Sequence, residues 1–321
     1  MIGVLGAGAW GTALANLAAR QGREVILWAR DDAHVAQMAG LGENRRRLPG
    51  VALAAGVKPS ADLFALAQAA LIVAAVPAQS LRGILEALAP VLPPGVPLVI
   101  CAKGIERATG LFLSDMAGFV LPQAPLAVLS GPSFASDVAR GLPTAVTLAT
   151  LHPGVAAAAQ AALAAPWFRL YHSADVRGVE IGGAGKNVLA IACGIAAGRG
   201  LGASAGAALI ARGFAELARF GRAYGARPET LMGLSGLGDL VLTCSSPQSR
   251  NFSCGLSLGR GEAVSGALAE GAMTASVLMA MAGARGVEMP VAGAVDAVLA
   301  GRQGVAQAIE ALLARPAGME G

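Results

Sequence analysis

The chain opens with Ile2-Gly-Val-Leu-Gly6-Ala-Gly8-Ala-Trp10-Gly11, which places three glycines at GxGxxG spacing between a strand-like run and a helical pattern. Gly6 allows a tight turn, Gly8 lets the backbone approach a pyrophosphate, and Gly11 lets helix and strand pack closely. The N-terminus of the following helix then faces the anion. We therefore predict that this segment begins a dinucleotide-binding fold.

Strand-like and helical segments alternate through the first half of the chain. The apolar runs typical of strands are Ile2–Leu5, Glu24–Trp28, Leu71–Val76, Pro97–Cys101, Leu126–Leu129, Ala145–Ala149 and Phe168–Tyr171. The helical patterns between them include Thr12–Arg20, Ser80–Leu88 and Gly154–Ala165. This alternation predicts an α/β Rossmann-type domain, with a mainly parallel sheet and helices on its faces.

The second half of the chain lacks strand signals. Helical patterns follow at Gly185–Ala197, Ala205–Tyr224, Thr274–Ala284, Val291–Leu299 and Val305–Ala314. The chain has 321 residues, and a single core rarely grows past about 250–300 residues, so two domains are favoured. We predict a Rossmann domain over residues 1–174 and an all-α domain over residues 175–321.

The hydropathy of the chain raises the question of a membrane protein, because hydrophobic residues make up 55% and the mean hydropathy is +0.60. The longest charge-free run, residues 141–168, is interrupted by Pro143, Pro153 and Pro166, whereas a spanning helix needs about 20 continuous apolar residues. No basic segment precedes the apolar run at the N-terminus, as a secretory signal would require. We expect no membrane span and a cytoplasmic protein.

Composition also limits the ligands. The four cysteines and three histidines lack the spacing of a metal site, so we expect no metal and free, buried thiols in a reducing compartment. The net charge is +4, but the basic residues are scattered apart from Arg45, Arg46 and Arg47, and aromatics make up 4%. This pattern disfavours nucleic acid and suits a small anionic ligand. The 44 glycines, with many alanines, indicate tight packing of small residues.

The second predicted strand ends in Trp28-Ala29-Arg30, where an NAD-selective site would usually place an acidic residue for the ribose 2′-hydroxyl. Arg30 can pair with a 2′-phosphate, which favours NADP. Asp31 and Asp32 follow directly and weaken that preference. We expect the protein to accept NADPH at least as well as NADH.

Lysine is scarce, because only Lys58, Lys103 and Lys186 occur among 24 lysines and arginines. Unlike an arginine, a lysine can be tuned to give up its proton, so each is a candidate for chemistry. Lys103 lies in Cys101-Ala-Lys-Gly-Ile-Glu106, after a predicted parallel strand, at the edge of the sheet where ligands bind. Lys186 lies in Glu180-Ile-Gly-Gly-Ala-Gly-Lys-Asn187 and is expected to open an apolar helix.

Four further segments complete a pattern: SGPSFA (residues 130–135), GLGDLVLTC (236–244), SRN (249–251) and AEG around Glu270. With GAGAWGTALA, KGIE and GKNVLAIACG, they resemble, in order and spacing over nearly the whole chain, the NAD(P)-dependent sn-glycerol-3-phosphate dehydrogenases of the bacterial type. The resemblance implies a Rossmann domain, a 6-phosphogluconate-dehydrogenase-like helical domain and an active site between them. It also implies interconversion of dihydroxyacetone phosphate and sn-glycerol 3-phosphate with NADP or NAD, which supplies phospholipid backbones.

The resemblance assigns roles to individual residues. The expected catalytic residues are Lys186, Lys103 and Asp239, with Lys186 as general acid/base if burial and a nearby cation lower its pKa from about 10.4. Asp239 is expected to orient Lys186. The substrate contacts are expected to be Lys103, Gly131, Ser133, Lys186, Asp239, Ser249, Arg250 and Asn251, the last three at the start of a helix through Phe252–Leu258. The cofactor contacts are expected to be Gly6, Gly8, Ala9, Trp10, Gly11, Arg30, Lys103, Ala135, Arg250, Leu268 and Glu270.

Some features depart from this pattern or leave it open. Ala9, Asp31 and Arg47 stand where a serine, a basic residue and an aromatic residue are common in the family. A β-hydroxyacid or 6-phosphogluconate-type dehydrogenase is an alternative, but it leaves KGIE and SRN unexplained. A non-catalytic NADP-binding module is another, and it leaves Lys186 and Asp239 unexplained. The sequence does not decide between NADH and NADPH, nor between a monomer and a homodimer.

Overall fold

The computed structural model describes residues 1–264 and 269–316, and the chain folds into two compact units. Unit 1 comprises Met1–Glu106 and Leu111–Glu180, and unit 2 comprises Arg107–Gly110 and Ile181–Gly321. The division after Glu180 and the boundary predicted after residue 174 both lie near the start of helix α7 (Val176–Gly198).

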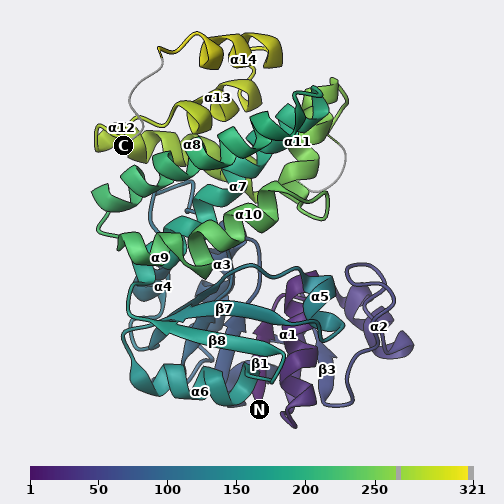
Figure 1. The fold of residues 1–321 in the computed structure, drawn as a ribbon. Coiled ribbons are helices and arrows are strands. Elements are labelled where there is room, and N and C mark those ends of the chain that lie inside the picture. Colours follow the sequence, from purple (N-terminus) through teal and green to yellow (C-terminus); the bar gives the residue numbers. More distant parts are fainter. Residues whose placement is uncertain (265–268, 317–321) are drawn as a thin grey trace. The chain divides into compact units, whose positions relative to one another are not determined.

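Unit 1 contains an eight-stranded sheet with the order β3-β2-β1-β4-β5-β6-β7-β8. Figure 1 labels β1, β3, β7 and β8 of this sheet. Neighbouring strands from β3 to β6 pair in parallel, β7 is antiparallel to β6, and β8 is parallel to β7. The mainly parallel Rossmann sheet is thus confirmed, and the crossover between β1 and β4 is the switch point at which such sheets bind ligands. The strands are β1 (Ile2–Leu5), β2 (Val25–Trp28), β3 (Val57–Ser60), β4 (Leu71–Ala74), β5 (Leu98–Ile100), β6 (Leu126–Ser130), β7 (Thr144–Ala149) and β8 (Phe168–Ser173).

Helices cover both faces of this sheet. Since successive strand residues point to opposite faces, Val73 belongs to one apolar core and Ile72 to the other. Helices α1, α2, α5 and α6 contribute to the first core, and η1, α3 and α4 to the second. Their bounds are α1 (Ala9–Arg20), α2 (Asp32–Leu41), η1 (Leu63–Gln68, a 3₁₀-helix), α3 (Ala78–Leu88), α4 (Leu113–Val120), α5 (Ala135–Ala139) and α6 (Pro153–Leu163).

Strand β3 was missed by the sequence analysis because it contains Lys58 and Pro59 and therefore lacks an apolar run. It lies at the edge of the sheet, where a proline is tolerated because one side of the strand has no ladder hydrogen bonds to make. Lys58 forms an exposed ion pair with Glu24 at 3.7 Å.

Unit 2 is helical, as predicted: within residues 181–264 and 269–316, every regular element is a helix. Helix α7 is the one described helix that is long and apolar enough to cross a membrane, but 83% of its apolar window is buried inside the protein, as in a core helix. The other helices are α8 (Gly202–Ala223), α9 (Pro228–Met232), η2 (Leu234–Gly238, a π-helix), α10 (Asp239–Cys244), α11 (Arg250–Arg260), α12 (Glu270–Ala284), α13 (Pro290–Leu299) and α14 (Val305–Leu313).

Helices α7 and α11 approach each other backbone to backbone through two pairs of glycines. Gly194 and Gly198 lie on α7, and Gly255 and Gly259 lie on α11. A Cβ atom at Gly255 would lie 2.1 Å from the Ile191 carbonyl oxygen, and the other three positions are similarly blocked by backbone atoms. The contact therefore admits only glycine, which agrees with the small-residue packing that the composition indicates.

We expect Gly255→Ala to destabilise the protein by at least about 1–3 kcal/mol, because the added methyl group forces α7 and α11 apart. Gly206→Ala in α8 is the matched control. A Cβ there meets nothing within 4 Å, and alanine favours a helix by up to about 1 kcal/mol over glycine. Thermal unfolding followed by circular dichroism measures both variants, and an equal effect of the two would contradict the glycine contact.

Candidate active site

The glycine-rich turn of unit 1 has the shape that a pyrophosphate requires. Gly6 has a φ of +105°, and a Cβ at Gly11 would lie 1.9 Å from the Gly6 carbonyl oxygen, so neither position accepts a side chain. A Cβ at Gly8 meets nothing within 4 Å, which leaves open space beside Ala9 and Trp10 in the first turn of α1. Because N–H groups of a first turn lack intrahelical partners, this turn fits the pyrophosphate of a dinucleotide.

Two strand ends bring Lys103, Gly131 and Ser133 together in unit 1. β5 and β6 are parallel, so their carboxyl ends lie at the same edge of the sheet. Lys103 Nζ donates to the Gly131 carbonyl oxygen at 3.2 Å, and Ser133 Oγ donates to the same oxygen at 3.0 Å. Gly131 has a φ of +149°, a conformation that favours glycine. These three predicted residues are therefore neighbours.

Lys186, Asp239 and Thr243 form a buried polar cluster in unit 2. Lys186 Nζ donates to Asp239 Oδ1 at 2.5 Å and to Thr243 Oγ1 at 2.8 Å. Thr243 Oγ1 in turn donates to the Asp239 carbonyl oxygen at 2.6 Å. Lys186 is 6% exposed and Asp239 is 1% exposed, and the carboxylate stabilises the buried ammonium form. Two hydrogen bonds thus hold the Lys186 ammonium in a fixed position.

The prediction that Lys186 opens its helix is wrong, because α7 begins at Val176 and Lys186 lies in its interior. The glycines before Lys186 suggested a turn, but they lie within the helix. A Cβ at Gly182 would lie 2.5 Å from the Ser235 carbonyl oxygen. A Cβ at Gly185 would lie 2.3 Å from Leu217 Cδ1. These glycines therefore allow η2 and α8 to approach α7.

Ser249, Arg250 and Asn251 begin helix α11, as the sequence predicts. Ser249 is the N-cap, and its Oγ accepts a backbone N–H of the first turn at 3.2 Å. Asn251 Nδ2 donates to Asn187 Oδ1 at 2.9 Å, and Asn251 Oδ1 accepts the Gly271 N–H at 2.9 Å. Arg250 is exposed, and its guanidinium makes no hydrogen bond or ion pair with the described part of the chain. It presents a positive charge at a helix N-terminus.

The remaining predicted cofactor contacts are more dispersed. Ala135 begins α5, Glu270 begins α12, and Arg30 is exposed just after β2. Leu268 lies outside the described residues. Among the predicted site residues, the structure thus brings together Lys103, Gly131 and Ser133 in unit 1, and Lys186 and Asp239 in unit 2. The functional roles of all the predicted site residues stay predictions.

Two residues of the unit 2 group were not singled out from the sequence. Thr243 lies four residues after Asp239 on one face of α10, and this i,i+4 spacing within GLGDLVLTC was a signal that could have identified it. Asn187 contacts Asn251, which is 64 residues away in sequence, so no local pattern reveals that pair.

Cys101, which follows β5, does not have the properties of a reactive thiol. All four cysteines are free and buried, as predicted. Burial raises the pKa of the Cys101 thiol to about 12. Cys101, two residues before Lys103, is therefore a neutral thiol near pH 7 and a poor nucleophile.

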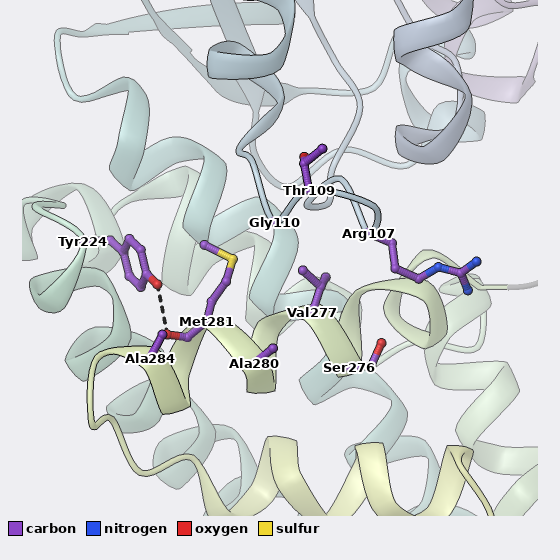
Figure 2. Close-up of a pocket in the computed structure, with 9 residues that line it drawn as sticks. All are labelled: Arg107, Thr109, Gly110, Tyr224, Ser276, Val277, Ala280, Met281 and Ala284. Atoms are coloured by element: carbon purple, nitrogen blue, oxygen red, sulfur yellow. Dashed lines mark hydrogen bonds between the residues drawn. The ribbon is translucent and has the colours of Figure 1, made fainter.

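A separate pocket of about 560 Å³ lies within unit 2 (Figure 2). It is lined by Arg107, Thr109 and Gly110, by residues of α12 and by Tyr224, whose hydroxyl donates to the Met281 carbonyl oxygen at 2.9 Å. Neither Lys186 nor Asp239 lines it, so this pocket does not mark the polar cluster described above.

Comparison with known proteins points to one family. Models described as the NAD-dependent glycerol-3-phosphate dehydrogenase N-terminus and C-terminus match residues 1–156 and 175–310. A glycerol-3-phosphate dehydrogenase (NAD(P)+) of Beijerinckia indica is 64% identical over 322 residues, covering 98% of this chain and 96% of its own. One of Azorhizobium caulinodans is 65% identical over 317 residues, covering 98% and 97%. The crystal structure of a glycerol-3-phosphate dehydrogenase from Coxiella burnetii has a TM-score of 0.92 at 38% identity, covering 98% of both chains.

Glu180, at the start of the motif that contains Lys186, carries a buried carboxyl group. Ser114 donates to it from its backbone N–H and from its Oγ, both at 2.7 Å, and Arg177 Nη1 lies 3.5 Å away. Burial raises the pKa of Glu180 from its ordinary 4.5 to about 7, with Asp115 adding to the rise and Ser114 and Arg177 opposing it. The folded protein therefore keeps this proton at pH values at which the unfolded chain releases it.

The raised pKa of Glu180 predicts that the folded protein becomes less stable as the pH rises. The stabilisation is complete below pH 4.5 and is lost as the pH rises through about 7, because only the folded state holds the proton in between. In wild type the free energy of unfolding should fall by up to about 3 kcal/mol over this pH range, since one pKa unit corresponds to about 1.4 kcal/mol. Glu180→Gln keeps a neutral side chain at every pH and should lack this fall. Urea unfolding at about pH 5 and pH 8 measures it. Glu24→Gln, at an exposed ion pair, is the control, and the same pH dependence in wild type and Glu180→Gln would refute the assignment.

Proposed function

Because the chain belongs to the NAD-dependent glycerol-3-phosphate dehydrogenase family, we propose that it reduces dihydroxyacetone phosphate to sn-glycerol 3-phosphate with NADPH or NADH. The observation that carries the chemistry is the buried contact of Lys186 with Asp239 and Thr243. A bound nicotinamide supplies the hydride for the carbonyl carbon. The carbonyl oxygen must gain a proton in the same reaction, and the chain has to provide it.

Lys186 is the general acid of this proposal. Its Nζ gives a proton to the ketone oxygen, the C=O bond becomes C–OH, and in the reverse direction the amine takes the proton back. Asp239 and Thr243 hold Nζ through the two hydrogen bonds, so that the proton is delivered at a fixed position. Asp239 also accepts a substrate hydroxyl. The low exposure of the cluster strengthens its electrostatic effect on the oxygen.

Arg250 holds the substrate phosphate in this proposal. Its exposed guanidinium and the N-terminus of α11 both favour an anion. Ser249 and Asn251 support that helix start. Within unit 1, Lys103 supplies a further positive charge beside substrate and cofactor, while Gly131 and Ser133 contact the substrate. The proposed cofactor contacts are the glycine-rich turn with Ala9 and Trp10, together with Arg30, Lys103, Ala135, Arg250 and Glu270.

We further propose that the enzyme works in the cytoplasm and feeds glycerophospholipid synthesis. Its product is the three-carbon backbone to which phospholipid acyl chains are attached. Four free, buried cysteines suit a reducing compartment.

The proton-donor role predicts a specific loss. Lys186→Met should lower turnover of dihydroxyacetone phosphate by at least about 10²–10⁴-fold, because the variant lacks the proposed proton donor. NADPH binding, measured by fluorescence titration, should stay within about twofold of wild type. Lys58→Met, which changes an exposed lysine at the edge of the sheet, is the control and should retain full turnover. Substantial turnover in Lys186→Met would exclude the lysine from the mechanism.

The phosphate role predicts a second pattern. Oxidation of NADPH should be much faster with dihydroxyacetone phosphate than with unphosphorylated dihydroxyacetone. At saturating NADPH, Arg250→Ala should raise KM for the phosphorylated substrate by about 10- to 100-fold, the value of a charged hydrogen bond, and should affect the weak reaction of dihydroxyacetone much less. Arg260→Ala, at the other end of the same helix, is the matched control. An unchanged KM in Arg250→Ala would place the phosphate elsewhere.

A further inference from the structure

The end of strand β2 is the position at which a Rossmann sheet meets the adenosine ribose. Trp28 and Ala29 are buried there, and Arg30 is the first exposed residue. A site selective for NAD uses a carboxylate at this place to bind the ribose 2′-hydroxyl. The first carboxylate along the chain after β2 is that of Asp31, so its partners bear on which cofactor the position suits.

Asp31 is engaged by protein groups. Its Oδ1 accepts the backbone N–H groups of Ala33 and His34 at 3.1 and 3.2 Å, and it thereby caps helix α2. Its Oδ2 accepts Arg46 Nη1 at 2.9 Å. The His34 hydrogen bond, followed by that of Arg46, lowers the pKa of Asp31. Both carboxylate oxygens therefore already have donors, and a guanidinium lies at the place where the ribose would otherwise find an acid.

The loop that carries Arg46 is fixed to the glycine-rich turn. Asn44 is fully buried, and its Nδ2 donates to the Ala7 carbonyl oxygen at 3.0 Å and to Thr12 Oγ1 at 2.8 Å. Its Oδ1 accepts the Arg47 N–H at 3.2 Å. The arginines that follow Asn44 thus belong to a loop that is anchored to the glycine-rich turn.

The arginines near the end of β2 and in this loop differ in whether they pair with a carboxylate of the protein. Arg45 pairs with Glu43 of its own loop at 3.2 Å. Arg46 pairs with Asp31 across the loop, whereas the guanidinium groups of Arg30 and Arg47 have no hydrogen bond or ion pair among residues 1–264 and 269–316. The exposed guanidinium groups of Arg30 and Arg47 are therefore available to an anion.

We propose that Arg46, held in place by Asp31, binds the 2′-phosphate of an adenosine ribose together with Arg30, and so determines selectivity for NADP. The inference rests on the dinucleotide site of the proposed function and adds a residue from outside the β2 segment. A guanidinium has five N–H groups, so Arg46 can bind a phosphate through two parallel hydrogen bonds while an N–H of Nη1 stays on Asp31. The acid beside Arg30 thus positions a cation and does not compete with the phosphate for it.

The test measures binding in the absence of turnover. Isothermal titration calorimetry of the full chain uses adenosine 2′,5′-bisphosphate and AMP, which differ by the 2′-phosphate. Arg46→Gln should weaken binding of the bisphosphate by about 10- to 100-fold and change AMP binding by less than about twofold. Arg45→Gln, a change of the same kind one residue earlier, should affect neither.

Two results would overturn the proposal. Unaltered bisphosphate binding in Arg46→Gln would show that the arginine does not meet the 2′-phosphate. Equal weakening of both nucleotides would show that it only supports the loop. Failure of the proposed function gives a different result, in which wild type binds the bisphosphate but does not oxidise NADPH with dihydroxyacetone phosphate.

Discussion

The close approach of neighbouring backbones to helix α7 is the constraint on which the arrangement of unit 2 depends. Gly182 admits η2, Gly194 admits α11, and a Cβ at Gly271 would lie 2.3 Å from the Asn187 carbonyl oxygen. Lys186 and Asn187 occupy the same stretch of α7, so these contacts fix how far each stands from its partner on another helix. The lysine cluster is therefore a product of main-chain packing as much as of its own hydrogen bonds.

Stability alone does not account for the buried Lys186–Asp239 pair. Removing two charges from water costs several kcal/mol per ion, and their attraction offsets this only with good geometry and further hydrogen bonds. Thr243 provides such a bond, and it is itself anchored on the Asp239 carbonyl oxygen. An apolar pair of similar volume would fill the same space at lower cost, which agrees with the proton-transfer role proposed for the cluster.

Local sequence patterns predicted the Rossmann sheet, the helical second half and the start of α11, because glycine spacing, apolar alternation and an N-cap serine act over a few residues. They failed where a distant neighbour decides the structure. Helix α7 begins ten residues before Lys186 because η2 and α8 pack on its glycines, and local signals for a turn were misleading there. Strand β3 was hidden because edge strands accept Pro59. The Asn187–Asn251 and Arg46–Asp31 contacts are long-range pairs of polar residues, for which the sequence carries no periodic signal.

The glycine contacts of α7 also shape the entropy of folding. A buried glycine or alanine has no rotamers to lose, whereas a long side chain loses up to about 2 kcal/mol of conformational freedom. At its four glycine positions the contact of α7 with α11 thus forms without that loss and has no rotamers to change. The corresponding cost lies in the denatured ensemble, since glycine has more backbone freedom to surrender than any other residue. The glycines of α7 therefore permit close helix packing in the folded protein, while they increase the conformational entropy of the unfolded chain.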